Sequence, residues 1–181
     1  MRHTGTQTIA TERLTLRRFT IEDAENMYYN WACDPEVTKY LTWQPHKSVE
    51  ETTEILQQWE EDYSKNDFYQ WAIEVNDIEQ PIGSISVVSL DEDVQSAEIG
   101  YCIGKSWWHQ GYTTEAVEAV IRFLMAEVGA GRVWAQHDVA NPNSGEVMKK
   151  AGMDYEGTLR QSAKNNQGIV DSAVYAKISH V

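Results

Sequence analysis

Cysteine is scarce in this chain of 181 residues, which contains only Cys33 and Cys102. Two cysteines are too few for the disulfide framework of a small secreted domain, and they lack the paired spacing of a zinc site. His46 and His137 also lack the spacing of metal ligands, so no metal is expected. The cysteine content is consistent with a reducing compartment.

Long hydrophobic runs are missing as well. The N-terminal segment MRHTGTQTIATERL has no apolar core of the signal-peptide type, and the most apolar stretch, AVEAVIRFLMAEVGA, is interrupted by Glu118, Arg122 and Glu127. We therefore expect a soluble, cytoplasmic protein with no membrane partner. The motif G-x-x-x-x-G-K-[ST] is absent too, which argues against a nucleotide-binding phosphotransferase.

Basic residues are few, because 15 Lys and Arg face 28 Asp and Glu and leave a formal net charge of -13. This field repels nucleic acid and attracts cations, amines or basic protein surfaces, so no nucleic-acid partner is expected. A phosphate-bearing ligand would need local backbone donors and a few cations such as Lys105, Lys149 or Lys150. An acidic pI that serves only solubility is an equally open interpretation.

The residues that are present predict one α/β domain over residues 1–181, with its core at residues 11–178. A hydrophobic content of 41% can bury one substantial core, and neither a repeat nor a long linker divides the chain. Apolar periodicity and capping residues predict helices at about 20–34, 48–63, 114–128 and 141–151. Alternation and turn clusters predict strands at about 14–19, 69–75, 81–90, 95–103, 132–139, 155–161 and 171–178.

The segment from Ala97 to Ala116, AEIGYCIGKSWWHQGYTTEA, predicts a strand, a loop that contains Gly104 and Gly111, and the start of a helix. A helix that opens after a glycine-bearing turn presents free N–H groups and the positive end of its dipole. Such a terminus suits an anionic group such as a pyrophosphate. An ordinary strand-to-helix turn is the alternative interpretation.

Together with the later segment VANPNSGEVMKKAGMDYEGTLR, this stretch resembles the GCN5-related N-acetyltransferase (GNAT) superfamily, in particular its RimJ/RimL branch of ribosomal-protein N-terminal acetyltransferases. The resemblance extends from Thr11 to Ile178. It implies a mixed, mostly antiparallel sheet whose strands are splayed where the thioester arm of acetyl-CoA enters. It also implies direct transfer of acetyl from acetyl-CoA to a primary amine.

The family motif of Arg or Gln, two residues, Gly, one residue, and Gly or Ala overlays on residues 108–113, where Trp108 and Thr113 depart from it. The resemblance implies that amides from about Ser106 to Thr114 bind the pyrophosphate, with Gly111 allowing a close backbone approach. The cofactor-binding residues that it implies are Ile99, Tyr101, Ile103, Ser106, Trp108, His109, Gln110, Gly111, Tyr112, Thr113, Thr114, Asn141, Ser144 and Lys149.

The resemblance also implies the residues for acid-base chemistry. Glu156 matches the glutamate that serves as base in the RimL-like branch, and Glu98 is the second candidate; either residue acts directly or through water. Many members use a tyrosine seven residues after the motif asparagine, but Met148 occupies that position here. The branch has a serine three residues after the asparagine, which makes Ser144 the candidate that stabilises the coenzyme thiolate. Each of these residues also has a structural interpretation, as a turn, strand-surface or capping residue.

The acceptor amine must be neutral, and its pKa indicates the acceptor class. An α-amine with a pKa of about 7.7 to 8 costs about 1 kcal/mol to deprotonate at pH 7, whereas a lysine near 10.4 costs roughly 4.6 kcal/mol. We therefore expect a protein N-terminus as acceptor, with polyamines or antibiotic amines as alternatives. A non-catalytic acyl-CoA-binding module and a homodimer also remain open.

Overall fold

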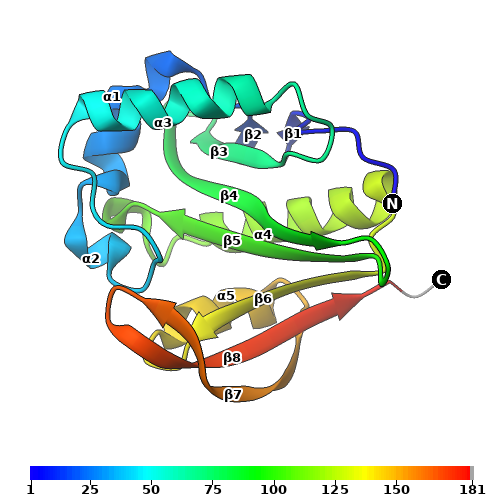
Figure 1. Cartoon of the computed structure of the whole chain (residues 1–181). Helices are drawn as coiled ribbons and strands as arrows, with labels where there is room; N and C mark the ends of the chain where they lie inside the picture. Colours follow the sequence, from blue (N-terminus) through cyan, green and yellow to red (C-terminus); the bar gives the residue numbers. More distant parts are fainter. Residues whose placement is uncertain (180–181) are drawn as a thin grey trace.

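Eight strands form one sheet in the computed structural model, which describes residues 1–179 (Figure 1). The order across the sheet is β1-β2-β3-β4-β5-β6-β8-β7. The strands are β1 (Ile9–Ala10), β2 (Leu14–Arg17), β3 (Gln70–Val75), β4 (Gln80–Asp91), β5 (Ser96–Ile103), β6 (Arg132–Asp138), β7 (Asp154–Asn165) and β8 (Gly168–Ile178). The helices are α1 (Ala24–Met27), α2 (Pro35–Thr38), α3 (Val49–Asp62), α4 (Tyr112–Phe123) and α5 (Pro142–Lys150).

Neighbouring strands run antiparallel throughout, except that β5 and β6 are parallel. The parallel ladder contains only three residue pairs, from Ser96 opposite Arg132 to Glu98 opposite Trp134. Beyond Glu98 the two strands diverge, while β5 stays paired with β4 as far as Ile103. The predicted mixed, mostly antiparallel and splayed sheet is confirmed.

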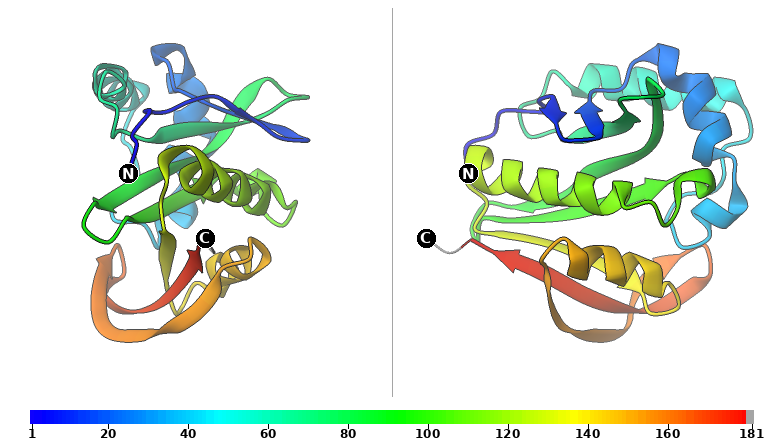
Figure 2. Two further views of the ribbon diagram at one scale, coloured as in Figure 1. Left: turned by 90° about the vertical axis from the view of Figure 1, so that its right-hand side faces the viewer. Right: turned by 180° about the vertical axis from the view of Figure 1, so that it is seen from behind.

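Helices cover both faces of the sheet. From behind, α4 and α5 lie across one face (Figure 2), and their buried side chains join the main core with residues of β2 to β6. On the other face, α1 and α3 enclose a second apolar cluster around Phe19, Trp31 and Leu56, against which Cys102 packs. The diverging strands β5 and β6 therefore have α4 and α5 on one face and α1 and α3 on the other.

The first predicted helix is interrupted. It begins as a 3-10 turn (Ile21–Asp23), continues as α1 and ends as a π-helical turn (Tyr28–Ala32). Asp34-Pro35 ends it as predicted, but the same pair also starts α2, which the sequence analysis did not identify. Asp34 Oδ1 accepts the N–H of Glu36 at 2.8 Å, and Pro35 occupies a first-turn position where no N–H is needed.

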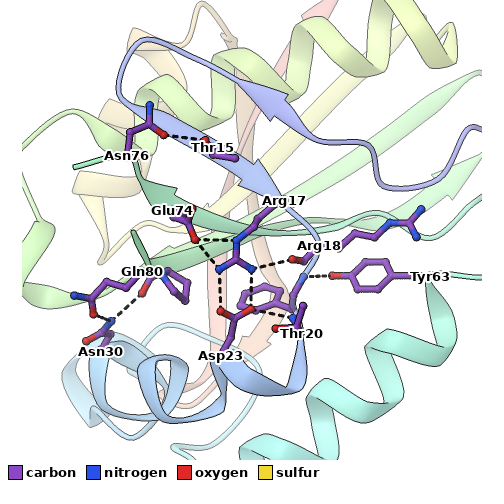
Figure 3. A network of polar contacts seen from close by, with 12 residues as sticks. Thr15, Arg17, Arg18, Thr20, Asp23, Asn30, Tyr63, Glu74, Asn76 and Gln80 are labelled. Atoms are coloured by element: carbon purple, nitrogen blue, oxygen red, sulfur yellow. Dashed lines mark hydrogen bonds and ion pairs between the residues drawn. The ribbon is translucent and has the colours of Figure 1, made fainter. Parts of the chain in front are cut away.

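Arg17 joins the N-terminal strands to this helical segment (Figure 3). Its Nη1 and Nη2 donate to the two carboxylate oxygens of Asp23, each at 2.8 Å, and its Nε donates to Glu74 Oε2 at 2.8 Å. The hydrogen bond with Asp23 is the largest cause that raises the pKa of Arg17, although partial burial opposes it. Asn30, from the π-helical turn, donates to the carbonyl oxygen of Pro81 at 2.8 Å and so ties the turn to β4.

Candidate active site

A cavity of about 1230 Å³ occupies the region where β5 and β6 diverge. Its walls come from β4, β5, the loop before α4, the first turn of α4, helix α5, the end of β6, the β7–β8 hairpin, part of α3, and residues 36–46. The ladder between β5 and β6 ends at Glu98. The backbone groups of residues 99–103 that face β6 therefore have no strand partner among residues 1–179. Backbone donors and acceptors at such an edge can pair with an extended ligand, apart from the Ile103 carbonyl oxygen, which accepts the Trp108 Nε1–H.

The loop between β5 and α4 is shaped by backbone conformations that few residues adopt. Gly111, directly before α4, has φ +82°, and His109 has φ +61°. A Cβ added to Gly111 would lie 3.2 Å from Arg13 Nη2, a side-chain atom that can move, so the reason for glycine here is the backbone conformation. Gly111, Thr113 and Thr114 line the cavity, so the start of α4, where helix N–H groups have no partner within the helix, lies at the cavity wall and suits an anion.

Alternation along β5 places its residues on the two faces of the sheet. Glu98, Gly100 and Cys102 share a face with Ser84 and Ser86, because Ser84 pairs with Cys102 and Ser86 with Gly100. This is the face covered by α1 and α3, because Cys102 packs against their cluster. We call it the α3 face, and the face covered by α4 and α5 the α4 face.

Tyr101 and Ser144 meet on the α4 face. The Tyr101 hydroxyl donates to the Ser144 carbonyl oxygen at 2.9 Å and lies 3.1 Å from Ser144 Oγ. Burial raises the pKa of Tyr101, although the hydrogen bond with Ser144 opposes the shift, so the phenol keeps its proton at neutral pH. Asn141 precedes α5 and makes no side-chain capping bond there, so capping does not account for its amide. All three residues line the cavity.

Glu98 is held on the α3 face by two donors. Ser89 Oγ donates to Glu98 Oε2 at 2.9 Å, and Gln136 Nε2 donates to Glu98 Oε1 at 2.8 Å. Gln136 Oε1 in turn accepts the hydroxyl of Ser172 at 2.7 Å. Gln136 belongs to β6, so this bond connects the two strands just beyond the point where their ladder ends. The carboxylate is therefore oriented at the apex of the gap.

Glu156, the first candidate base from the sequence, does not line the cavity. Arg132 Nη1 donates to Glu156 Oε1 at 2.7 Å, and a second bond joins Arg132 Nη2 to Glu156 Oε2. Arg132 is in the first residue pair of the β5–β6 ladder, at the closed end of the gap, and neither residue lines the cavity. The hydrogen bonds from Arg132 lower the pKa of Glu156, which makes its carboxylate a weaker base. The sequence could not show this, because Arg132 is 24 residues away.

The structure brings most of the other predicted site residues together. The cavity is lined by Glu98, Ile99, Tyr101, Ile103, Trp108, His109, Gly111, Thr113, Thr114, Asn141 and Ser144. Four predicted residues do not line it: Ser106, Gln110, Tyr112 and Lys149. Lys149 pairs instead with Glu146 at 2.8 Å. Gln136 and Ser172 were not identified from the sequence. The one signal that could have found them is a polar residue in each of the strands β6 and β8, which follow β5 in the order of the sheet.

The Cys102 thiol does not have the environment of a nucleophile. Cys102 is partly buried and lines the cavity, but burial raises the pKa of its thiol, and its Sγ lies 3.5 Å from Ser84 Oγ, which argues against a nucleophile. Within residues 1–179, no three His, Cys, Asp or Glu side chains are grouped closely enough to hold a metal ion. In the same range, no helix combines the length and apolar character needed to cross a bilayer.

Comparison with known proteins identifies this arrangement. The model of the acetyltransferase (GNAT) domain family matches residues 13–154. The chain belongs to the GNAT acetyltransferase family. The N-acetyltransferase YoaA of Bacillus subtilis, which is itself uncharacterized, is 31% identical over 168 residues, which are 93% of this chain and 94% of that protein. The ribosomal-protein-serine acetyltransferase of Escherichia coli is 32% identical over 97 residues, 54% of each chain.

A solved structure shares the fold. The structure of RimL, a ribosomal L7/L12 α-N-protein acetyltransferase in complex with coenzyme A, has a TM-score of 0.82 and 20% identity, and the match covers 95% of this chain and 98% of that one. The protein is thus an acetyl-CoA-dependent N-acetyltransferase. Its residues fit that co-substrate. Gly111 shapes the start of α4, whose first N–H groups can bind the diphosphate, and the edge of β5 beyond Glu98, which β6 does not pair with, can bind the extended arm.

Proposed function

We propose that this acetyltransferase modifies a protein N-terminal α-amine, with Glu98 as the base and Ser144 as the residue that stabilises the leaving thiolate. One observation carries the assignment. Glu98 lies on the α3 face of the gap between β5 and β6, whereas Ser144 and Tyr101 lie on its α4 face. Acetyl transfer from a thioester to an amine requires a proton acceptor for the amine and a proton donor for the departing sulfur. Glu98 and Ser144 provide these groups on opposite sides of the gap.

The chemistry follows from these positions. Acetyl-CoA supplies the acetyl group as a thioester. Glu98 accepts a proton from the amine, directly or through water, as the new C–N bond forms. The Ser144 hydroxyl donates a hydrogen bond to the sulfur as the C–S bond breaks, and the Tyr101 hydroxyl, which donates to the Ser144 carbonyl oxygen, holds this residue in place. Alignment of the two reactants in the gap supplies much of the rate.

The shape of the α3 face supports a slender acceptor that enters end-on. Asn166, at the tip of the β7–β8 hairpin, accepts and donates hydrogen bonds across to the segment that follows α2. Its N–H donates to the Leu41 carbonyl oxygen at 3.0 Å, and its Nδ2 donates to the carbonyl oxygens of Thr38 at 2.9 Å and Trp43 at 2.7 Å. The hairpin is thus tied to the segment that follows α2 beside the cavity, an enclosure that favours a slender acceptor.

Two further arguments favour the α-amine. It is easier to deprotonate than a lysine at neutral pH, and the net charge of -13 attracts a basic protein. The names of the Escherichia coli relative and of the RimL structure describe ribosomal-protein acetyltransferases, and the second specifies an α-N-protein acceptor. These similarities support the proposed acceptor class.

The experiment that tests the proposal measures thiol release from acetyl-CoA with a panel of acceptors. We expect turnover with basic peptides that have free N-termini and little turnover with the same peptides after N-terminal blocking, even when they contain lysine. Turnover only with polyamines or aminoglycosides would replace the proposed acceptor by a small amine. Coenzyme A binding without thiol release for any amine would identify a non-catalytic module.

Replacement of Ser144 by alanine is expected to lower kcat at least tenfold while the KM for the acceptor peptide changes little, because the hydrogen bond to the thiolate forms only as the C–S bond breaks. Tyr101→Phe, which removes one hydroxyl from the same pair, should give a smaller decrease. Steady-state thiol release measures both variants. A Ser144→Ala enzyme with the wild-type kcat would remove Ser144 from the proposed mechanism.

A further inference from the structure

Arg13 reaches the end of α4 that opens the proposed cofactor site, although it precedes β2 in the sequence. Its backbone N–H donates to Glu115 Oε1 at 2.9 Å, and its Nε donates to Glu115 Oε2 at 2.7 Å. Its Nη1 donates to the Gln110 carbonyl oxygen at 2.9 Å, and its guanidinium carbon lies 4.6 Å from the centroid of the Tyr112 ring. One side chain therefore contacts three residues around Gly111.

The bond to Gln110 fixes the peptide that joins Gln110 to Gly111. In a trans peptide the carbonyl and the N–H point in opposite directions. Anchoring the carbonyl oxygen on Arg13 therefore directs the Gly111 N–H away from Arg13. Gly111 lines the cavity and has φ +82°, a conformation that glycine can leave easily unless its neighbours hold it. Arg13 supplies that constraint.

Arg13 also compensates a carboxylate. The Glu115 side chain is only 18% exposed and lies in the first turn of α4, where an unpaired negative charge would repel a diphosphate. Burial raises the pKa of Glu115, but hydrogen bonds from Thr11 and Arg13 outweigh burial and lower it, so Glu115 is ionised at neutral pH. The ion pair with Arg13 offsets this charge beside the helix N-terminus.

We propose that Arg13 is a positioning residue for the diphosphate of acetyl-CoA, an inference that rests on the proposed function of this site. Trp108 stands where the family motif has Arg or Gln, and its indole Nε1 is occupied by the Ile103 carbonyl oxygen at 2.9 Å. Arg13 brings a guanidinium to the same loop from the turn before β2. It acts through Gln110 and Glu115, by orienting the amide cradle and neutralising the carboxylate next to it.

The test compares donors with and without a diphosphate. For Arg13→Ala, we expect the Kd for coenzyme A by calorimetry and the KM for acetyl-CoA to rise about tenfold or more, with kcat within about twofold of wild type. With acetyl-pantetheine, which has no diphosphate, the variant should match wild type. Arg13→Lys should fall between the two, because an ammonium keeps the charge but cannot span both acceptors as the guanidinium fork does.

Arg122→Ala is the matched control. Arg122 lies on α4, is 68% exposed, and its one ion pair among the described residues is with Glu118 at 3.9 Å, so this variant should bind coenzyme A as wild type does. Unchanged coenzyme A affinity in Arg13→Ala and Arg13→Lys would overturn the inference, as would an equal loss for acetyl-CoA and acetyl-pantetheine. A wild-type protein that does not bind coenzyme A would instead refute the proposed site itself, and this result is visible before any variant is made.

Discussion

Replacement of Glu98 by glutamine is expected to lower kcat by about a hundredfold or more, with little change in the KM for acetyl-CoA. Glutamine cannot accept the proton that the amine must lose. It can keep the local network, because its amide oxygen accepts from Gln136 Nε2 and its N–H donates to the Ser89 hydroxyl, which can act as donor or acceptor. Thiol release with a saturating basic peptide measures the effect, and thermal unfolding checks that the fold is intact.

Glu156→Gln is the control for this experiment. Glu156 is about 40% exposed and paired with Arg132 at the closed end of the β5–β6 gap, so its loss should leave kcat within about twofold of wild type. A Glu98→Gln enzyme with full activity, or a Glu156→Gln enzyme that loses it, would return the role of base to Glu156.

Replacement of Gly83 by alanine is expected to destabilise the protein by about 3 kcal/mol. A Cβ at this position would lie 2.3 Å from the Cys102 carbonyl oxygen and 2.8 Å from the Ile103 Cα. Both are backbone atoms of β5, so relief requires the strands to separate. Gly83 is paired with Ile103, and the separation would also displace the strand edge that we assign to the cofactor arm. Urea unfolding measures the stability, and calorimetry with coenzyme A measures the second effect.

Gly100→Ala provides the comparison within β5. A Cβ there would contact only Val88 Cγ1, at 3.1 Å, and Val88 is an exposed side chain that can move. The free energy of unfolding should therefore change by less than about 1 kcal/mol, partly because alanine restricts the unfolded chain. Equal losses in the two variants would show that close backbone approach at Gly83 is not the cause.

Local patterns predicted most elements because the signals that define them lie within a few residues. The capping pair Ser48 and Glu51 located α3, whose Ser48 Oγ accepts the N–H of Glu51 at 3.3 Å. Apolar spacing located α4, although it begins at Tyr112, two residues earlier than predicted, because Gly111 provides the left-handed residue before the helix. Residues 124–128, predicted as part of the same helix, form a π-helical turn. The short β1 and α2 were missed because two and four residues carry too little periodicity.

Most predicted residues of the candidate site line the cavity, but several do not. Most predicted residues of the continuous segment from β5 to α4 line the cavity, since one strand and one helix start determine their positions, but Ser106, Gln110 and Tyr112 do not. Glu156 was favoured over Glu98 by resemblance alone, and its pairing with Arg132 depends on how β6 and β7 lie against β8. The contact of Arg13 with Gln110 spans 97 residues and has no local signal in either segment.

The sequence by itself determined the class of the protein: an acidic α/β chain with a glycine-bearing strand-to-helix turn and the family's paired motifs. These properties are encoded by neighbouring residues, through helix periodicity, capping and the backbone freedom of glycine. Only the tertiary structure decided which carboxylate faces the gap, which cation holds the turn and where the sheet opens. Those outcomes depend on strand order and register, because the interacting groups meet only after distant segments have packed together.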